Sequence, residues 1–201
     1  GLSDDLDALN AALHDLAAEP NDASLRQFVM LTAQSLSSEI QRTYTSARDY
    51  QAELDAGLTD IVDRVNALSQ KVADLNLQIM VLEGGNALDS DATGLRDERY
   101  RTLKELSELV KINSQEQETG AVTVFIGGDF LVADTNVRNL TVSKEREANN
   151  GKVIFEDTGA EVSITGGRLQ AMTEGRDKLL GGVIDGLDRM AMDLIQEFNT
   201  V

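Results

Sequence analysis

An uninterrupted apolar stripe is the feature of this sequence that most constrains its fold. Its nine positions follow one another in alternating steps of four and three residues, with no polar residue among them: Leu54, Leu58, Ile61, Val65, Leu68, Val72, Leu75, Ile79 and Leu82. This heptad spacing is typical of a helix that packs against partner helices. The stripe, here called the apolar seam, predicts one long helix whose apolar face is covered by this chain or by another. It favours a structural or assembly protein over an enzyme.

The composition fits helix-on-helix packing and excludes several kinds of site. Aromatic residues make up 4% of the 201 residues, and proline occurs once, so we expect long helices with aliphatic cores. Cysteine is absent, which excludes disulfides, thiolate metal sites and a cysteine nucleophile. The net charge of -17 disfavours binding to nucleic acid and to anionic membranes, because their phosphates would be repelled.

Membrane-spanning and targeting segments are not expected in this sequence. It contains no run of about 18 apolar residues, the length that a membrane span requires. Residues 1–20 lack the basic start and the continuous apolar stretch of a signal peptide. The sequence opens and closes within helical patterns, so we interpret it as a fragment whose targeting signals would lie elsewhere.

Four helices are predicted from apolar periodicity and from helix-breaking residues, at residues 4–18, 22–83, 95–112 and 168–198. Ser3 is the expected N-cap of the first helix, and Gly84-Gly85 is expected to end the second. Gly57 lies off the seam and is expected to cost about 1 kcal/mol relative to alanine without ending the helix. Gly181-Gly182 and Gly186 are expected to mark a slight bend or a close helix crossing.

The sequence changes period after residue 120. Val122, Val124 and Ile126 alternate with polar residues, and Gly127-Gly128 predicts a hairpin turn before residues 130–132. Weaker strands are expected at residues 140–142, 153–155 and 162–164, whereas residues 113–120 are polar and predict a loop. Residues 121–165 are therefore expected to form a small, mostly antiparallel β unit.

The predicted fold class is mainly α, an elongated antiparallel and coiled-coil-like helical bundle with a small β-hairpin appendage. Its expected segments are a helical rod at 1–120, the β unit at 121–165 and a returning long helix at 166–201. Two further apolar stripes, Leu95–Val110 and Leu169–Phe198, are available to cover the seam. We therefore expect the chain to be a monomer rather than a dimer joined through residues 54–82.

No catalytic, cofactor-binding or metal-binding residue is predicted. The string Asp89-x-Asp91-x-Thr93-Gly94 matches half of a calcium loop, but the bidentate glutamate expected at position 12 is Tyr100. We interpret the string as a polar turn that caps a helix. His14 is the single histidine and lacks a nucleophile elbow or an oxyanion loop around it. The glycine pairs lack the context of phosphate loops, and the methionines Met172, Met190 and Met192 are expected as core or helix-face residues.

Several local strings resemble a known family when they are taken in order. They are Leu25-Arg26-Gln27, Val65-Asn66-Ala67-Leu68, Leu75-Asn76-x-x-Ile79, Arg96-Asp97-x-Arg99, the Gly127-Gly128 hairpin, Gly166-Gly167-Arg168-Leu169 with Arg176-Asp177, Leu187-Asp188-Arg189-Met190 and Phe198-Asn199. No single string is specific, but their order is similar to that in the flagellar hook-associated protein 1 family of hook–filament junction proteins. The resemblance covers nearly the whole sequence. It departs from the family at Glu98, where glutamine is frequent, and in having no room for a large outer domain.

The resemblance implies a non-catalytic axial protein of the bacterial flagellum, built from helices and lacking the family's terminal assembly helices. The partners that it implies are copies of itself in a ring, the flagellar hook protein, the second hook–filament junction protein and an export chaperone acting through a region outside this sequence. It also implies export through the flagellar secretion channel to an extracellular location. The alternative that remains open is a helical-rod interaction module of another secreted or sensor assembly, and an enzyme is a third possibility.

Overall fold

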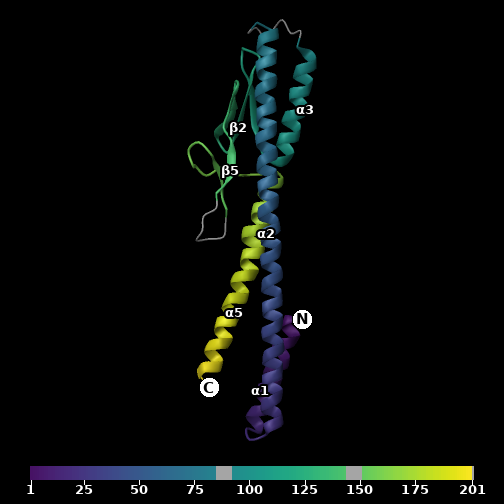
Figure 1. Cartoon of the computed structure of the whole chain (residues 1–201), viewed down its shortest axis with the longest axis vertical. Coiled ribbons are helices and arrows are strands. Elements are labelled where there is room, and N and C mark those ends of the chain that lie inside the picture. Colours follow the sequence, from purple (N-terminus) through teal and green to yellow (C-terminus); the bar gives the residue numbers. More distant parts are fainter. Residues whose placement is uncertain (85–91, 144–150, 201) are drawn as a thin grey trace. The chain divides into compact units, whose positions relative to one another are not determined.

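The structure, a computed structural model, describes residues 1–84, 92–143 and 151–200 (Figure 1). Its elements in chain order are α1 (Leu2–Ala18), α2 (Ala23–Leu82), α3 (Thr93–Leu109), β1 (Asn113–Glu116), β2 (Val122–Ile126), β3 (Asp129–Ala133), β4 (Asn136–Val137), β5 (Leu140–Val142), β6 (Val153–Phe155), α4 (Gly167–Glu174), the π-helical segment η1 (Gly175–Leu180) and α5 (Gly181–Thr200). The predicted class, mainly helical with a small antiparallel β part, is confirmed. The chain forms two compact units: unit 1 comprises residues 1–52 and 179–201, and unit 2 comprises residues 53–178.

Unit 1 contains a helical hairpin formed by α1 and the first half of α2. Its buried core consists of Leu9, Ala12, Val29 and Leu36, which lie on the facing sides of the two helices. The Asp22 carboxylate begins α2, because its Oδ1 accepts hydrogen bonds from the backbone N–H groups of residues 24 and 25 in the first turn. α1 begins at Leu2 with Gly1 as its N-cap, so the prediction that Ser3 caps this helix was wrong.

Unit 2 is organised around the apolar seam on the second half of α2. Seven of the nine seam positions are buried: Leu58, Ile61, Val65, Leu68, Val72, Leu75 and Ile79. Leu54 is half-buried, whereas Leu82 is 60% exposed at the end of the helix. The heptad pattern thus correctly predicted a buried face, although its last position lies beyond the core.

A helix and a sheet together cover the seam, rather than helices alone. In the core of unit 2, seam residues pack with Leu106 of α3, Val124 and Leu131 of the sheet, and Leu169 of α4. The stripe predicted at residues 169–198 contributes only its first members to this core, since residues from 179 onwards belong to unit 1. This stripe was expected to be available to cover the seam, and its first members, Leu169 and Met172, do pack in this core. The sheet supplies further cover, through alternate residues of β2 and through Leu131 and Val132 of β3.

The β part of unit 2 consists of two antiparallel sheets, one of four strands in the order β1-β2-β3-β4 and one formed by β5 and β6. Gly127 and Gly128 have φ values of 59° and 101°, so they provide the left-handed turn of the β2–β3 hairpin. Residues 113–116 form strand β1 instead of the predicted loop, because they pair with β2 while their side chains stay exposed. Residues 162–164 form no strand; next to them, Glu161 makes an isolated bridge to Ile154.

The last predicted helix is divided into α4, η1 and α5. Of the two alternatives expected for the glycines of this helix, a slight bend or a close crossing, the close crossing does not occur at Gly182 or Gly186, because a Cβ added there would meet nothing within 4 Å. The close approach lies elsewhere, at Gly57 of α2, where a Cβ would collide with the terminal methyl group of Met172. The glycine that was expected only to weaken α2 therefore lets α4 pack against it.

Candidate assembly surface

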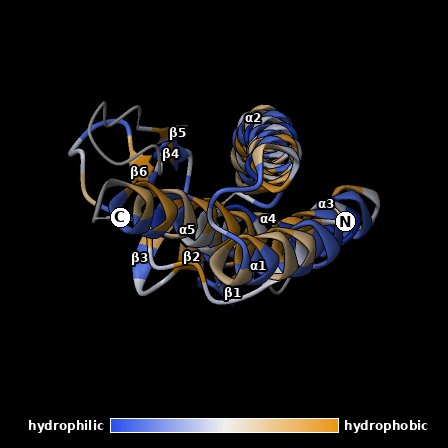
Figure 2. Ribbon diagram, turned by 90° about the horizontal axis from the view of Figure 1, so that it is seen from below, coloured by the Kyte–Doolittle hydropathy of each residue, from blue (hydrophilic) through white to orange (hydrophobic). Residues whose placement is uncertain are grey.

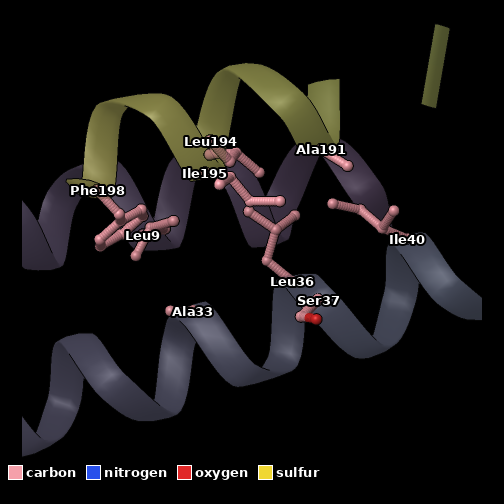
Figure 3. Close-up of a pocket in the computed structure, with 9 residues that line it drawn as sticks. All are labelled: Leu9, Ala33, Leu36, Ser37, Ile40, Ala191, Leu194, Ile195 and Phe198. Atoms are coloured by element: carbon pink, nitrogen blue, oxygen red, sulfur yellow. The ribbon is translucent and has the colours of Figure 1, made fainter. Parts of the chain in front are cut away.

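A groove lined by apolar side chains lies between α1, α2 and α5 of unit 1 (Figure 3). It has a volume of about 340 Å³ and is lined by Leu9, Ala33, Leu36, Ser37, Ile40, Ala191, Leu194, Ile195 and Phe198. A second hollow next to the groove is lined by Leu187, near the start of α5, and by Tyr44 of α2. The groove itself is lined by Phe198, near the end of α5, and by Ala33, which precedes Tyr44 on α2. α5 is therefore antiparallel to α2 here, and the groove runs along these two helices with Leu9 of α1 in its lining.

α5 also carries apolar side chains outside the groove. Ile184 and Leu187 are buried, whereas Val183 and Met192 are exposed on the same helix. Hydrophobic and hydrophilic residues alternate along both α1 and α5 (Figure 2). An exposed apolar surface that lines a groove is typical of a contact surface for another protein rather than of isolated surface residues. The arrangement can bind the apolar face of a helix.

Two asparagines on α2 attach the β strands of unit 2 to the long helix. The Asn76 side chain donates to the carbonyl of Val122 (2.8 Å) and accepts from the N–H of the same residue (3.0 Å). Asn66 makes the same pair of bonds with Leu140, both at 2.8 Å. Because an amide side chain offers both a donor and an acceptor, each asparagine imitates a neighbouring strand. We call these two contacts the asparagine clamps.

Two arginines of α3 extend the clamp at Asn76. Arg99 is buried, and its Nη1 donates to the Asn76 Oδ1 (2.9 Å) and to the Gly120 carbonyl (2.6 Å). Burial lowers the pKa of Arg99, an effect that the Glu116 carboxylate opposes. Arg96 bridges Glu83 at the end of α2 and Glu116 of β1. These bonds to Glu83 and Glu116 raise the pKa of Arg96. The network fixes α2, α3 and the sheet against one another.

A third arginine is buried in η1. Arg176 is 1% exposed, and its guanidinium binds Asp177 (2.5 Å) and Asp55 of α2 (2.9 Å). Although burial by itself lowers the pKa of Arg176, the two carboxylates outweigh this effect and raise it. A buried charge needs such partners, so Arg176 ties η1 to α2.

The candidate residues from the sequence lie apart from one another. His14 is exposed on α1, and Thr93 and Gly94 form the first turn of α3, while Asp89 and Asp91 lie outside the described residues. Within residues 1–84, 92–143 and 151–200, no group of three or more histidine or acidic side chains is placed to hold a metal ion. Nor is any helix in these ranges both long and apolar enough to cross a membrane. Met172 packs against the core of unit 2, as predicted for a core methionine.

The sequence patterns did not identify the clamp asparagines or the buried arginines as structural residues. Asn76, Arg96 and Arg99 all lie within the two strings that carry the family resemblance, and Asn66 and Arg176 lie in neighbouring strings. The available signal was a polar residue standing next to seam positions, as Asn66 stands beside Val65 and Asn76 beside Leu75. Polar groups buried in this way need specific partners, which here are strand backbones and carboxylates.

Comparison with known proteins places the chain in a family. The model of the helical domain of flagellar hook-associated protein FlgK matches residues 1–201. Flagellar hook-associated protein 1 of Escherichia coli (strain K12) is 23% identical over 197 residues, which cover 94% of this chain and 36% of that protein. The protein of the same name from Salmonella typhimurium is 23% identical over 206 residues, covering 98% and 37%. The chain thus spans little more than a third of the length of these curated relatives.

The fold agrees with a solved structure. The flagellar hook junction protein FlgK from Burkholderia pseudomallei superposes with a TM-score of 0.74 at 24% identity, over 88% of this chain and 33% of that one. This likeness shows that the two share a fold. Because the family model matches the full 201 residues, the chain belongs to the family of the FlgK helical domain of flagellar hook-associated proteins.

Proposed function

We propose that this chain is part of a structural axial protein of the bacterial flagellum that joins the hook to the filament-side components. The observation that carries the proposal is the match of all 201 residues to the helical domain of flagellar hook-associated protein FlgK. The relatives that match over nearly the whole chain bear the name flagellar hook-associated protein 1. The protein would be associated with the flagellum, exported through its secretion channel and located outside the cell.

The proposed role is mechanical and non-catalytic. The 60-residue helix α2 carries the core of unit 2 on its seam, and the asparagine clamps hold the strands to it. The predicted segments are a rod at 1–120, a β unit at 121–165 and a returning helix at 166–201, and each of the two compact units would act as a stiff building block. Tightly packed interiors resist deformation, which suits the proposed mechanical role at a junction.

The proposed partners are copies of this protein in a ring, the hook protein, the second hook–filament junction protein and an export chaperone that binds outside these 201 residues. The groove of unit 1 supports contacts of this kind, since its exposed lining residues Ile195 and Phe198 can bury apolar surface against a neighbouring helix. The outer faces of the helices and the β unit would supply the remaining contacts. Because the chain is strongly acidic, basic patches on the partners would favour binding.

Deletion of the gene in a flagellated host tests this proposal. The expected result is that hooks still form while filament protein is lost to the medium, and that the intact gene on a plasmid restores filaments. Normal filaments on the deletion strain would rule out the junction role. Loss of the hooks as well would contradict the proposed position after the hook in assembly.

A further inference from the structure

The apolar groove of unit 1 continues into the hollow next to it. Ser37, Ile40 and Ala191 line both, so the two form one continuous depression between α2 and α5, here called the channel. On α2 its lining extends from Ala33 to Tyr44, a separation of eleven residues, which corresponds to about 16 Å of helix. About three turns of a further helix would fill this length.

The two ends of the channel differ in chemistry. At the end near Phe198 the lining side chains are apolar, among them Leu9 of α1 (Figure 3). At the other end the lining includes Gln41, Tyr44 and the acidic residue Asp188. In the part of the chain that the structure describes, no basic side chain forms an ion pair with Asp188. A helix with an apolar face and a cationic side chain at one end would therefore complement both ends of the channel.

The charge of unit 1 argues against a second copy of this chain as the occupant. The unit has twelve acidic side chains and no lysine, and its four basic side chains are arginines. Three of these, Arg42, Arg48 and Arg189, already donate hydrogen bonds within the chain. A second copy would bring mainly negative charge towards Asp188, and like charges repel. A basic helix from a different protein fits the channel better.

We propose that the channel binds one amphipathic helix of another protein, whose apolar face covers Ile195 and Phe198 and whose lysine or arginine at one end pairs with Asp188. Burial of apolar surface would supply most of the affinity, since Ile195 and Phe198 are 61% and 46% exposed in the chain alone. The pair with Asp188 would fix the direction of the bound helix, because the cation has a partner at one end only. This inference rests on the proposed function for the presence of such a partner, and it names the partner's chemistry.

Peptide binding followed by fluorescence anisotropy tests the proposal. Two synthetic helical peptides of about four turns carry leucines along one face and differ only at one end, which has either two lysines or two glutamates. We expect the chain to bind the lysine peptide about tenfold more tightly than the glutamate peptide. Ile195→Ser should weaken binding of the lysine peptide by about tenfold. Met192→Ser is the matched control and should leave binding unchanged, because Met192 is similarly exposed but lies outside the lining. Failure of the lysine peptide to bind, or equal binding to the Ile195→Ser chain, overturns the proposal.

Asp188→Asn tests the polar end of the channel, with Asp185→Asn as its matched control. Both substitutions remove one negative charge from α5, but Asp185 is not among the residues that line the channel. Asp188→Asn should weaken binding of the lysine peptide by about two- to fivefold, whereas Asp185→Asn should leave it unchanged. Equal effects of the two substitutions would mean that the peptide senses only the overall charge, which contradicts the proposed pair.

Other occupants of the channel would give different results. A dimer of the chain that Ile195→Ser dissociates in sedimentation velocity would make the occupant a second copy. In the full-length protein, thiol labelling of Ile195→Cys should be as fast as that of Met192→Cys. Labelling that is slow at position 195 alone would mean that a further segment of the same protein fills the channel. Either result overturns this inference without changing the outcome of gene deletion, so its failure can be told apart from failure of the junction role.

Discussion

The Nη1 of Arg99 donates a hydrogen bond of 2.9 Å to the Oδ1 of Asn76, and both side chains are buried. The same Oδ1 accepts the N–H of Val122, and the Asn76 amide donates to the carbonyls of Val122 and Asp134. Asn76 thereby provides hydrogen-bond partners for the Arg99 guanidinium of α3 and for backbone groups of the sheet. Removing it would leave several buried polar groups without partners at once.

Asn76→Ala should lower the free energy of unfolding by about 3 kcal/mol, because a buried unsatisfied polar group costs about 1–3 kcal/mol. Urea denaturation followed by circular dichroism measures this change. Asn66→Ala is the matched control, since Asn66 makes the same pair of backbone bonds at a half-buried position. It should cost about 1 kcal/mol, as water can replace some of the lost bonds. Equal losses for the two variants would contradict the role assigned to burial.

The apolar seam supports a second prediction. Leu58→Ala should destabilise the chain by about 2–5 kcal/mol, because Leu58 is fully buried and its truncation leaves a cavity. Leu82→Ala is the matched control on the same seam, and it should change stability by less than about 0.5 kcal/mol because Leu82 is exposed. Thermal or urea denaturation of the two variants checks this. A large loss for Leu82→Ala would show that the end of the seam is covered after all.

The Asp22 carboxylate at the start of α2 predicts that the free energy of unfolding depends on pH. The backbone N–H groups of Ser24 and Leu25 hold the pKa of the Asp22 carboxyl below its usual value. Its stabilising contribution is therefore complete above the unfolded pKa, which is about 3.9, and is lost as the pH falls through the lower folded pKa. An asparagine at this position can cap a helix but cannot titrate. Compared with the Asp22→Asn variant, the unchanged chain should lose more stability on acidification below about pH 4. A constant difference between the two at all pH values would contradict this.

The buried seam also predicts the oligomeric state of these 201 residues. Seven seam positions are already covered within the chain, and its net charge of -17 makes copies repel each other. Sedimentation velocity should therefore show a monomer. A stable parallel dimer whose contacts lie in residues 54–82 would mean that the seam is a coiled-coil interface.

Much of the fold could be predicted from the periodicity of apolar residues. The seam predicted α2 because a helix that buries one face must repeat its apolar residues every three or four positions. The hairpin at Gly127-Gly128 could be predicted because only glycine adopts such φ values readily. Strand β1 could not, since its four side chains are exposed and its order comes from backbone pairing with β2. Pairing between backbone groups does not require a particular pattern of side chains, so the sequence does not reveal it.

The candidate surface was harder to predict than the fold. The expected stripe at residues 169–198 contained Val183, whereas the neighbouring Ile184 is the buried residue of this turn. The groove depends on how three segments distant in sequence come together, which local periodicity does not specify. Asn76 and Arg99 were recognised only as parts of family-like strings, because their partners are backbone groups far along the chain.

The proposed role depends most directly on the apolar groove of unit 1, and one substitution tests it. Ile195 lines the groove and is 61% exposed, whereas Met192 on the same helix is 63% exposed and is not among the lining residues. A gene-deletion strain would be complemented with the full-length protein carrying Ile195→Asp or Met192→Asp, and filaments would be counted by electron microscopy. We predict that both variants keep their thermal stability, that Met192→Asp restores filaments and that Ile195→Asp leaves bare hooks. Normal filaments with a folded Ile195→Asp protein would contradict a role of this groove in assembly.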